Sequence, residues 1–157
     1  MADEKMMRLS KQVYQTLCEA LDNRNWDYDK DDENLLVYFG VSGDSMAIRV
    51  IITIDTERQL IRLTACPPFK MSEEKRLEGA IAACFVSYGM ADGSFDYNFY
   101  DGTIAFRMTQ TFRDSQIGEE FFQYMISCAC VMVDRYSDKF LALDKGAITI
   151  ADFITKD

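Results

Sequence analysis

The sequence contains no histidine, and it has only two prolines and one tryptophan among 157 residues. The absence of histidine excludes imidazole acid/base catalysis, nucleophiles paired with histidine, and the commonest nitrogen ligand of zinc, copper and iron. Walker, G-x-S-x-G and G-x-G-x-x-G motifs are also absent. We therefore expect no catalytic residues, no cofactor and no metal.

Positive charge is scarce as well. The chain has 17 Lys and Arg against 26 Asp and Glu, which gives a net charge of −9 and a pI near 4.5. Nucleic acids and anionic membranes attract basic surfaces and repel a chain of this charge. No stretch approaches the ~18 apolar residues of a membrane span, and residues 1–5 do not begin a signal peptide. We expect a cytoplasmic protein that binds neither nucleic acid nor membrane.

The cysteines form no recognisable redox or metal motif. They are odd in number, lie within apolar segments and show no C-x-x-C spacing. This pattern predicts reduced, buried thiols, in keeping with a cytoplasmic location. The five residues are Cys18, Cys66, Cys84, Cys128 and Cys130.

The length fits one domain over residues 1–157, because a typical domain has roughly 150 residues. Hydrophobic periods of 3.6 and 2 predict an α+β fold in which an antiparallel sheet packs against helices. The expected order is helix, three-stranded meander, helix, hairpin, helix, or α-β-β-β-α-β-β-α. The elements are helices at 3–23, 72–89 and about 114–136, and strands at 35–41, 46–54, 61–66, 95–99 and 104–109, with Asp101-Gly102 as a two-residue hairpin turn.

The third predicted helix is apolar nearly all round, because only Gln123 and Ser127 are polar between positions 121 and 133. A single sheet covers only one side of such a helix. We therefore expect a second cover, most simply another subunit. The alternative is that the other helices or residues 140–154 wrap it within one chain. The stripe assigned to a dimer interface comprises Phe122, Ile126, Cys130 and Val133.

One face of the predicted sheet gathers cations. If the aliphatic residues of the strands face the helices, Arg49, Arg62 and Arg107 project from the opposite face, together with threonines. Guanidinium groups pair with carboxylates, so this face is predicted to bind a carboxylate-rich or extended peptide. The alternative is an ordinary solvated face with a cross-strand pair to Asp96.

Two other patterns admit simpler interpretations. The acidic run at 27–33 begins like a calcium loop, but Asp32 stands where glycine is needed and Tyr38 where glutamate is needed, so we expect a solvated connector. Ser72 and Lys75 match the S-x-x-K string of acyltransferases, but the accompanying motifs are absent. A helix N-cap at Ser72 accounts for the same residues.

From Trp26 onward the chain resembles the YbjN family of bacterial proteins, described as sensory-transduction regulators, whose fold is that of type III secretion chaperones. The residues that carry the resemblance are Ile48-Arg49-Val50, Ile52-Thr53-Ile54-Asp55, Pro68, Arg76, Gly93-Ser94-Phe95-Asp96-Tyr97, Asp101-Gly102 and Phe106-Arg107. The resemblance implies a small homodimeric protein that binds other proteins and has no established catalytic residues. It further implies that Gly93, Phe95, Gly102 and Arg107 are framework positions.

These observations favour a non-enzymatic protein-binding module, chaperone-like or regulatory, that acts as a homodimer in a bacterial cytoplasm. One alternative is a small-molecule-binding protein or an enzyme that uses carboxylates or a thiol, which would show a deep pocket with perturbed pKa values. Another is a subunit whose role is assembly through the third helix.

Overall fold

Alternating apolar and polar residues form the strands of this protein. The computed structural model describes residues 3–155 and places six strands in one sheet. Along the central strands, buried residues alternate with exposed or half-buried ones, as the sequence predicts. The strands are β1 (Asp29–Asp31), β2 (Leu36–Ser42), β3 (Ala47–Asp55), β4 (Leu60–Cys66), β5 (Ser94–Tyr97) and β6 (Ile104–Thr111).

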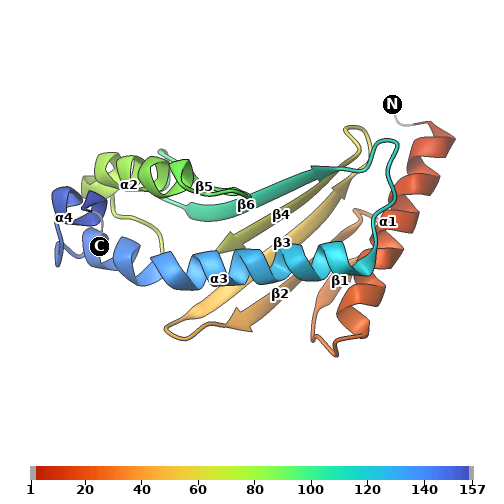
Figure 1. Ribbon diagram of the computed structural model, residues 1–157, viewed down its shortest axis with the longest axis horizontal. Coiled ribbons are helices and arrows are strands. Elements are labelled where there is room, and N and C mark those ends of the chain that lie inside the picture. The colour runs from red at the N-terminus through yellow and green to blue at the C-terminus, as the bar shows by residue number, and fades with distance from the viewer. Residues whose placement is uncertain (1–2, 156–157) are drawn as a thin grey trace.

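The sheet is antiparallel throughout, with the order β1-β2-β3-β4-β6-β5 (Figure 1). The predicted meander is β2-β3-β4, and the predicted hairpin joins it through β6. This leaves β1 and β5 at the edges. β1 is short, with Asp29 opposite Tyr38 and Asp31 opposite Leu36, so it covers only the first half of β2.

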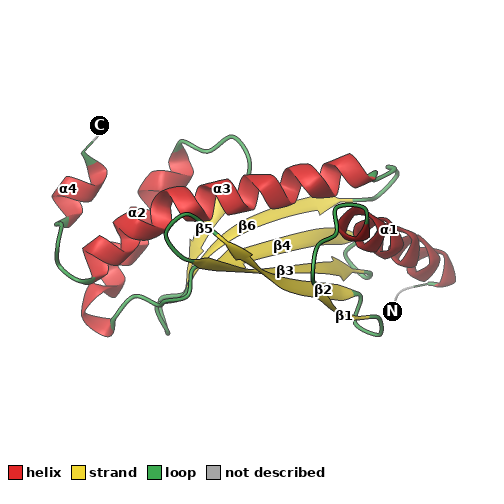
Figure 2. Cartoon of the chain, turned by 90° about the horizontal axis from the view of Figure 1, so that it is seen from below, coloured by secondary structure: helices red, strands yellow, loops and turns green. Residues whose placement is uncertain are grey.

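The helices are α1 (Glu4–Asp22), α2 (Arg76–Tyr88), α3 (Glu119–Asp144) and α4 (Ile150–Ile154), with a 3₁₀ turn, η1 (Glu73–Lys75), before α2. α3 lies along one face of the sheet, and no helix covers the opposite face within residues 3–155 (Figure 2). α1 lies at one end of α3, while α2 and α4 lie at the other (Figure 1). None of these helices is long and apolar enough to cross a membrane.

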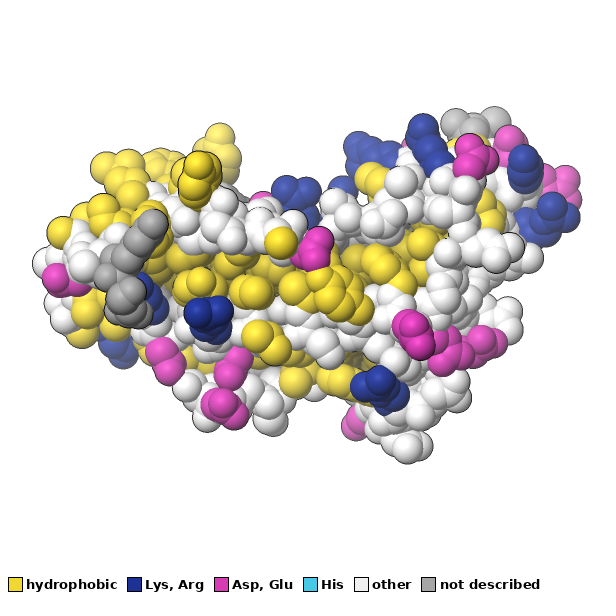
Figure 3. Space-filling model, viewed as in Figure 1, with side chains coloured by type: hydrophobic (Ala, Val, Ile, Leu, Met, Phe, Trp, Pro, Cys, Tyr) yellow, Lys and Arg dark blue, Asp and Glu magenta, His cyan; other side chains and the backbone are white. Residues whose placement is uncertain are grey.

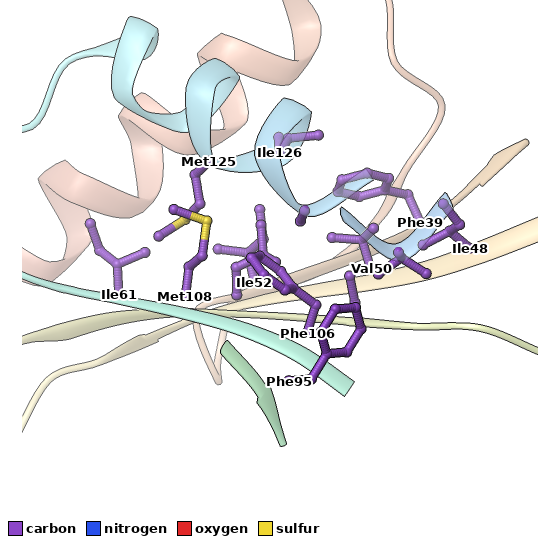
Figure 4. Packing of buried hydrophobic residues seen from close by; sticks show 14 of the residues in the cluster. Phe39, Ile48, Val50, Ile52, Ile61, Phe95, Phe106, Met108, Met125 and Ile126 are labelled. Atoms are coloured by element: carbon purple, nitrogen blue, oxygen red, sulfur yellow. The ribbon is translucent and has the colours of Figure 1, made fainter. Parts of the chain in front are cut away.

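The main core lies between α3 and the sheet. Met125 of α3 points toward the sheet, where Ile52 and Val50 of β3 and Phe106 of β6 lie (Figure 4). All four side chains are fully buried. Burial of this area provides the main driving force for the α3-on-sheet arrangement.

The structure adds two short elements that the sequence did not predict. β1 consists of Asp-Lys-Asp and therefore has no apolar alternation, and α4 has only five residues. α3 begins at Glu119 rather than near residue 114 and continues to Asp144, because Phe140 and Leu143 extend its buried stripe. The fold class and the order of the longer elements agree with the prediction.

One local prediction is wrong, and a second holds for the position of a residue but not for its hydrogen bond. Asn98 N donates to Thr103 O at 2.9 Å, so the hairpin loop comprises residues 99–102 and is longer than the expected two-residue turn. Ser72 is the N-cap residue of η1, as predicted, but its side chain makes no capping hydrogen bond. Instead its backbone N–H donates to the Asp144 carboxylate at 2.7 Å.

Candidate functional site

The outer face of the sheet, opposite α3, holds the three arginines singled out from the sequence. Cross-strand register sets Arg49 beside Gly40 and Cys66, whereas Arg62 lies beside Thr53 and Thr109, four residues further along the strands. The structure thus brings the arginines to one face but spreads them along it.

Arg107 already has a partner on this face. Its Nε and Nη2 donate to the two carboxylate oxygens of Asp96 at 2.5 and 3.1 Å, and these bonds raise the pKa of Arg107. This is the cross-strand pair with Asp96 that the sequence offers as the alternative to peptide binding by Arg107. Arg49 and Arg62 are exposed and form no ion pair within residues 3–155. They are the arginines on this face that a partner could reach.

A hollow of about 470 Å³ lies on the outer face beside Arg49. Gly40, Tyr38 and Ile51 line it, and the last two side chains are each 47% exposed. Asp29 lines it at the end where β1 pairs with Tyr38. An apolar floor beside an unpaired cation is suited to a side chain with an apolar stem and an anionic end.

The second candidate surface is the outward face of α2, which we call the α2 stripe. Its large side chains recur at helical spacing and are exposed, and hydrophobic atoms gather over this helix (Figure 3). An apolar helix face of this size, left uncovered, is typical of an interaction site. The α2 stripe comprises Leu77 (67% exposed), Ile81 (43%), Cys84, Phe85 (38%) and Tyr88 (95%).

The small residues of α2 explain why its large ones face outward. Gly79, Ala82 and Ala83 are buried and allow the helix to lie close to β5. A Cβ at Gly79 would come within 2.8 Å of the Tyr97 ring. The sequence predicts a helix over this segment but does not reveal that its large residues are uncovered. The recurring small residues at positions 79, 82 and 83 were the available signal.

The dimer interface predicted on α3 must be corrected. Phe122 and Val133 are fully buried and Ile126 is 5% exposed, all in the core of their own chain, and Cys130 is half-buried. Side chains buried against their own sheet cannot contact another subunit without unfolding α3. The exposed apolar residues of α3 are instead Tyr124 and Val131.

The thiols are poorly suited to nucleophilic chemistry. Burial raises the pKa of Cys18, Cys66, Cys128 and Cys130, which keeps these groups in the protonated, unreactive form at neutral pH. For Cys130 the pKa rises to about 11. The remaining cysteine, Cys84, is exposed on the α2 stripe.

The acidic run at 27–33 serves local structure. Asp31 accepts hydrogen bonds from the Asn34 side chain at 2.8 Å and from the backbone N–H groups of Asn34 and Glu33 at 3.0 and 3.1 Å. These bonds lower the pKa of Asp31 and close the turn between β1 and β2. Asp32 accepts a hydrogen bond from Tyr14 OH at 2.9 Å, which ties the connector to α1. No cluster in residues 3–155 has the composition of a metal site.

No family model matches this sequence, and no curated protein matches it. Solved structures do match. YbjN from E. coli, described as a candidate transcription regulator, has a TM-score of 0.58 at 10% identity, over 80% of this chain and 92% of its own. A chain of the ExsC–ExsE complex has a TM-score of 0.53 at 15% identity, over 81% of this chain and 94% of its own. The HopA1–SchA chaperone-effector complex also has a TM-score of 0.53, at 12% identity, over 81% of this chain and 94% of its own.

The fold is that of YbjN and the type III secretion chaperones. Identities of 10–15% establish this fold and leave the activity to be argued from surfaces. The neighbours include chaperone complexes with protein partners and a candidate regulator, which are non-enzymatic kinds of protein.

The positions that carried the YbjN resemblance have structural roles in this YbjN-like fold. Gly93 and Gly102 adopt positive φ angles of 72° and 77°. Phe95 stacks edge-on against Phe106, with ring centroids 5.4 Å apart, and Arg107 pairs with Asp96. These interactions fix β5 and its loops to β6, so the resemblance reports the framework of the sheet.

Proposed function

We propose that this protein is a non-enzymatic, protein-binding module of the YbjN family, chaperone-like or regulatory, that acts as a homodimer in a bacterial cytoplasm. The observation that carries the proposal is the α2 stripe, an uncharged apolar surface on a chain of net charge −9. Two such acidic molecules can approach one another most closely where neither presents charge.

A second copy is the simplest cover for the α2 stripe. In a twofold dimer the same patch meets itself, and a stripe of Leu, Ile, Phe and Tyr is complementary to its own copy. The α2 stripe therefore replaces Phe122, Ile126, Cys130 and Val133 as the proposed dimer contact. The other large open surface, the outer face of the sheet with exposed Arg49 and Arg62, is then available to a different protein.

The properties of the titratable groups favour a binding role over the alternative of a carboxylate- or thiol-dependent enzyme. Four of the five thiols have raised pKa values. The carboxyl groups with shifted pKa values are Asp31, Asp101 and Asp152, and each is lowered by hydrogen bonds within a turn or helix cap. Lowered values stabilise the anion, whereas a general acid needs a raised one.

Light scattering coupled to size-exclusion chromatography tests the dimer. We expect a mass of twice 18.1 kDa for the natural protein. The double substitution Ile81→Glu and Phe85→Glu should give a folded monomer, because both side chains are exposed in the single chain, with a melting temperature that no longer depends on protein concentration. Val131→Glu on α3, also at an exposed apolar position, is the matched control and should remain dimeric.

Alkylation of Cys84 offers an independent measurement. In the proposed dimer the thiol is covered, so its rate of reaction with iodoacetamide should rise as the protein is diluted through the dissociation constant. A natural protein that is monomeric at about 100 µM, or a Cys84 rate independent of concentration, would exclude the α2 dimer.

A further inference from the structure

Gly40 opens the hollow that lies beside Arg49 on the outer face of the sheet. Side chains of this face stand in rows across the strands, because residues directly opposite one another in antiparallel strands point to the same side. One row holds Asp29, Tyr38 and Ile51, and the next row holds Gly40 and Arg49. Outside the chain neighbours of Gly40, the nearest atom to a Cβ there would be 4.0 Å away, so the space above this residue is open.

The hollow has the size and the uncharged floor of a small-molecule site. Its volume of about 470 Å³ lies within the range of about 300–1,000 Å³ that such sites occupy. Tyr38 and Ile51 present a ring and an aliphatic side chain to it. Half-buried Thr64 and Cys66 line its end on β4, and burial raises the pKa of the Cys66 thiol, which stays uncharged at neutral pH. An apolar ring or chain can therefore rest on this floor.

Two side chains of opposite charge border the floor. Arg49 lies on β3 and Asp29 on β1, and both are exposed and line the hollow. Neither side chain has a hydrogen-bond or ion-pair partner within residues 3–155. Two strand spacings of about 4.8 Å and one two-residue step of about 6.8 Å separate their Cα atoms, which are thus about 12 Å apart. One small molecule can therefore contact both charges.

This arrangement of charges selects a zwitterion. A ligand with only a carboxylate would be attracted by Arg49 and repelled by Asp29, and a ligand with only an ammonium group would experience the reverse. A free α-amino acid carries both groups on one carbon. A charge-assisted hydrogen bond of about 2.8 Å at each group leaves the rest of the separation of about 12 Å to the two protein side chains.

We propose that the hollow binds a free α-amino acid with an apolar side chain. Its carboxylate pairs with Arg49, its ammonium group pairs with Asp29, and its side chain lies on Tyr38 and Ile51. This site goes beyond the proposed function and does not depend on it. Arg62 lies four residues further along the strands and outside the hollow, so it takes no part in this site.

The probe is L-phenylalanine, titrated into the natural protein and followed by the shifts of backbone amide signals in two-dimensional NMR spectra. We expect a dissociation constant at or below about 1 mM, with the largest shifts in β2 and β3 beside the hollow. Two compounds of similar size each lack one charge. These are 3-phenylpropionate, without the ammonium group, and 2-phenylethylamine, without the carboxylate, and each should bind at least about tenfold more weakly than L-phenylalanine.

Charge-neutral variants assign the two groups of the ligand. Arg49→Gln should weaken L-phenylalanine about tenfold and leave 2-phenylethylamine unchanged or tighter, whereas Asp29→Asn should weaken L-phenylalanine and leave 3-phenylpropionate unchanged or tighter. Both positions are exposed, so these variants should fold. Arg62→Gln, the same change on the same face outside the hollow, is the matched control and should alter the affinity less than about twofold.

Substitution of Gly40 tests the shape of the site. Gly40→Val places a branched side chain in the open space and should abolish binding of L-phenylalanine, and urea titration shows whether the variant is folded. Should it not fold, the variants at positions 29 and 49 decide the question alone.

The outcomes separate this site from the proposed function, since the mass of the protein in solution tests the dimer independently. Absence of amide shifts at about 10 mM L-phenylalanine would overturn the site. Equal affinities for the three compounds, or tighter binding of 3-phenylpropionate than of L-phenylalanine, would overturn the recognition of a zwitterion. Equal losses for Arg49→Gln and Arg62→Gln would place binding elsewhere on the protein.

Discussion

At the scale of single residues, glycine positions show how closely separate loops approach one another. Gly102 combines a φ of 77° with contact against another segment, since a Cβ there would lie 2.1 Å from the backbone oxygen of Met71. The Met71 N–H also donates to Gly102 O at 2.8 Å. The loop after β5 therefore helps to hold the segment that leads into α2.

We predict that Gly102→Ala lowers the free energy of unfolding by about 2–4 kcal/mol, from the unfavourable φ and from the clash with Met71. Gly146→Ala is the matched control, because Gly146 has a φ of 72° but no atom within 4 Å of a Cβ. It should lose only about 1 kcal/mol. Urea titration measures both, and equal losses would show that the approach to Met71 contributes nothing.

Single residues of the candidate site were predictable where period-2 alternation decides the face. Alternation placed Arg49, Arg62 and Arg107 on one side of the sheet, and the structure agrees. It could not say that Arg107 pairs with Asp96, because that depends on β5 lying beside β6 in one register. Nor could it find that β1 ends opposite Tyr38, since β1 carries no apolar pattern that marks its end.

At the scale of elements, α4 packs residues 150–154 against α3. Phe153 is fully buried and its ring centroid lies 5.3 Å from that of Phe140 in α3. Lys139 places its ammonium 4.9 Å from the centre of the Phe153 ring. A capping box between Thr149 and Asp152 begins the helix. α4 thus anchors residues 150–154 to α3 of the same chain.

We predict that Phe153→Ala destabilises the protein by about 3 kcal/mol, the cost of an unfilled cavity beneath α4. Ile154→Ala, at a neighbouring side chain that is 41% exposed, should change stability by less than 1 kcal/mol. Thermal or urea unfolding followed by circular dichroism distinguishes them. If the two variants lose the same stability, α4 does not depend on its buried phenylalanine.

The long helices and strands could be predicted because each carries many repeats of one hydrophobic period. Which side of a helix faces the sheet could not be predicted in this way. α3 has two apolar stripes, and pattern alone could not tell which meets the sheet, so buried Phe122 and Val133 were assigned to a partner. On α2 the close approach of Gly79 to Tyr97 turns the larger residues outward. Both choices are made by packing between elements that are distant in sequence.

At the scale of the whole molecule, shape and charge divide the surface into two distinct regions. α3 covers one face of the sheet and leaves the other open, while α2 presents apolar side chains at one end (Figures 1 and 2). The acidic surplus is spread over the chain, but Arg49 and Arg62 stand unpaired among residues 3–155 on the open face. The proposed dimer contact and the proposed partner-binding face therefore lie on separate parts of the surface.

The net charge makes the salt dependence of the proposed dimer a test of what holds it. A domain of this length has a radius of gyration of about 15 Å, so two touching copies bring charges of −9 to about 30 Å apart. At 0.05 M salt this repulsion amounts to on the order of 1 kcal/mol, and at 1 M it is screened out. Apolar contacts on the α2 stripe are not weakened by salt.

We therefore predict that the dimer becomes tighter with salt, with a dissociation constant about fivefold lower in 1 M than in 0.05 M NaCl, measured by sedimentation equilibrium. Lowering the pH toward 4.5 should act in the same direction, because the net charge falls toward zero. An interface held by ion pairs would respond oppositely to salt. A dimer that dissociates as salt is added would thus show that charged residues outside the α2 stripe join the two copies.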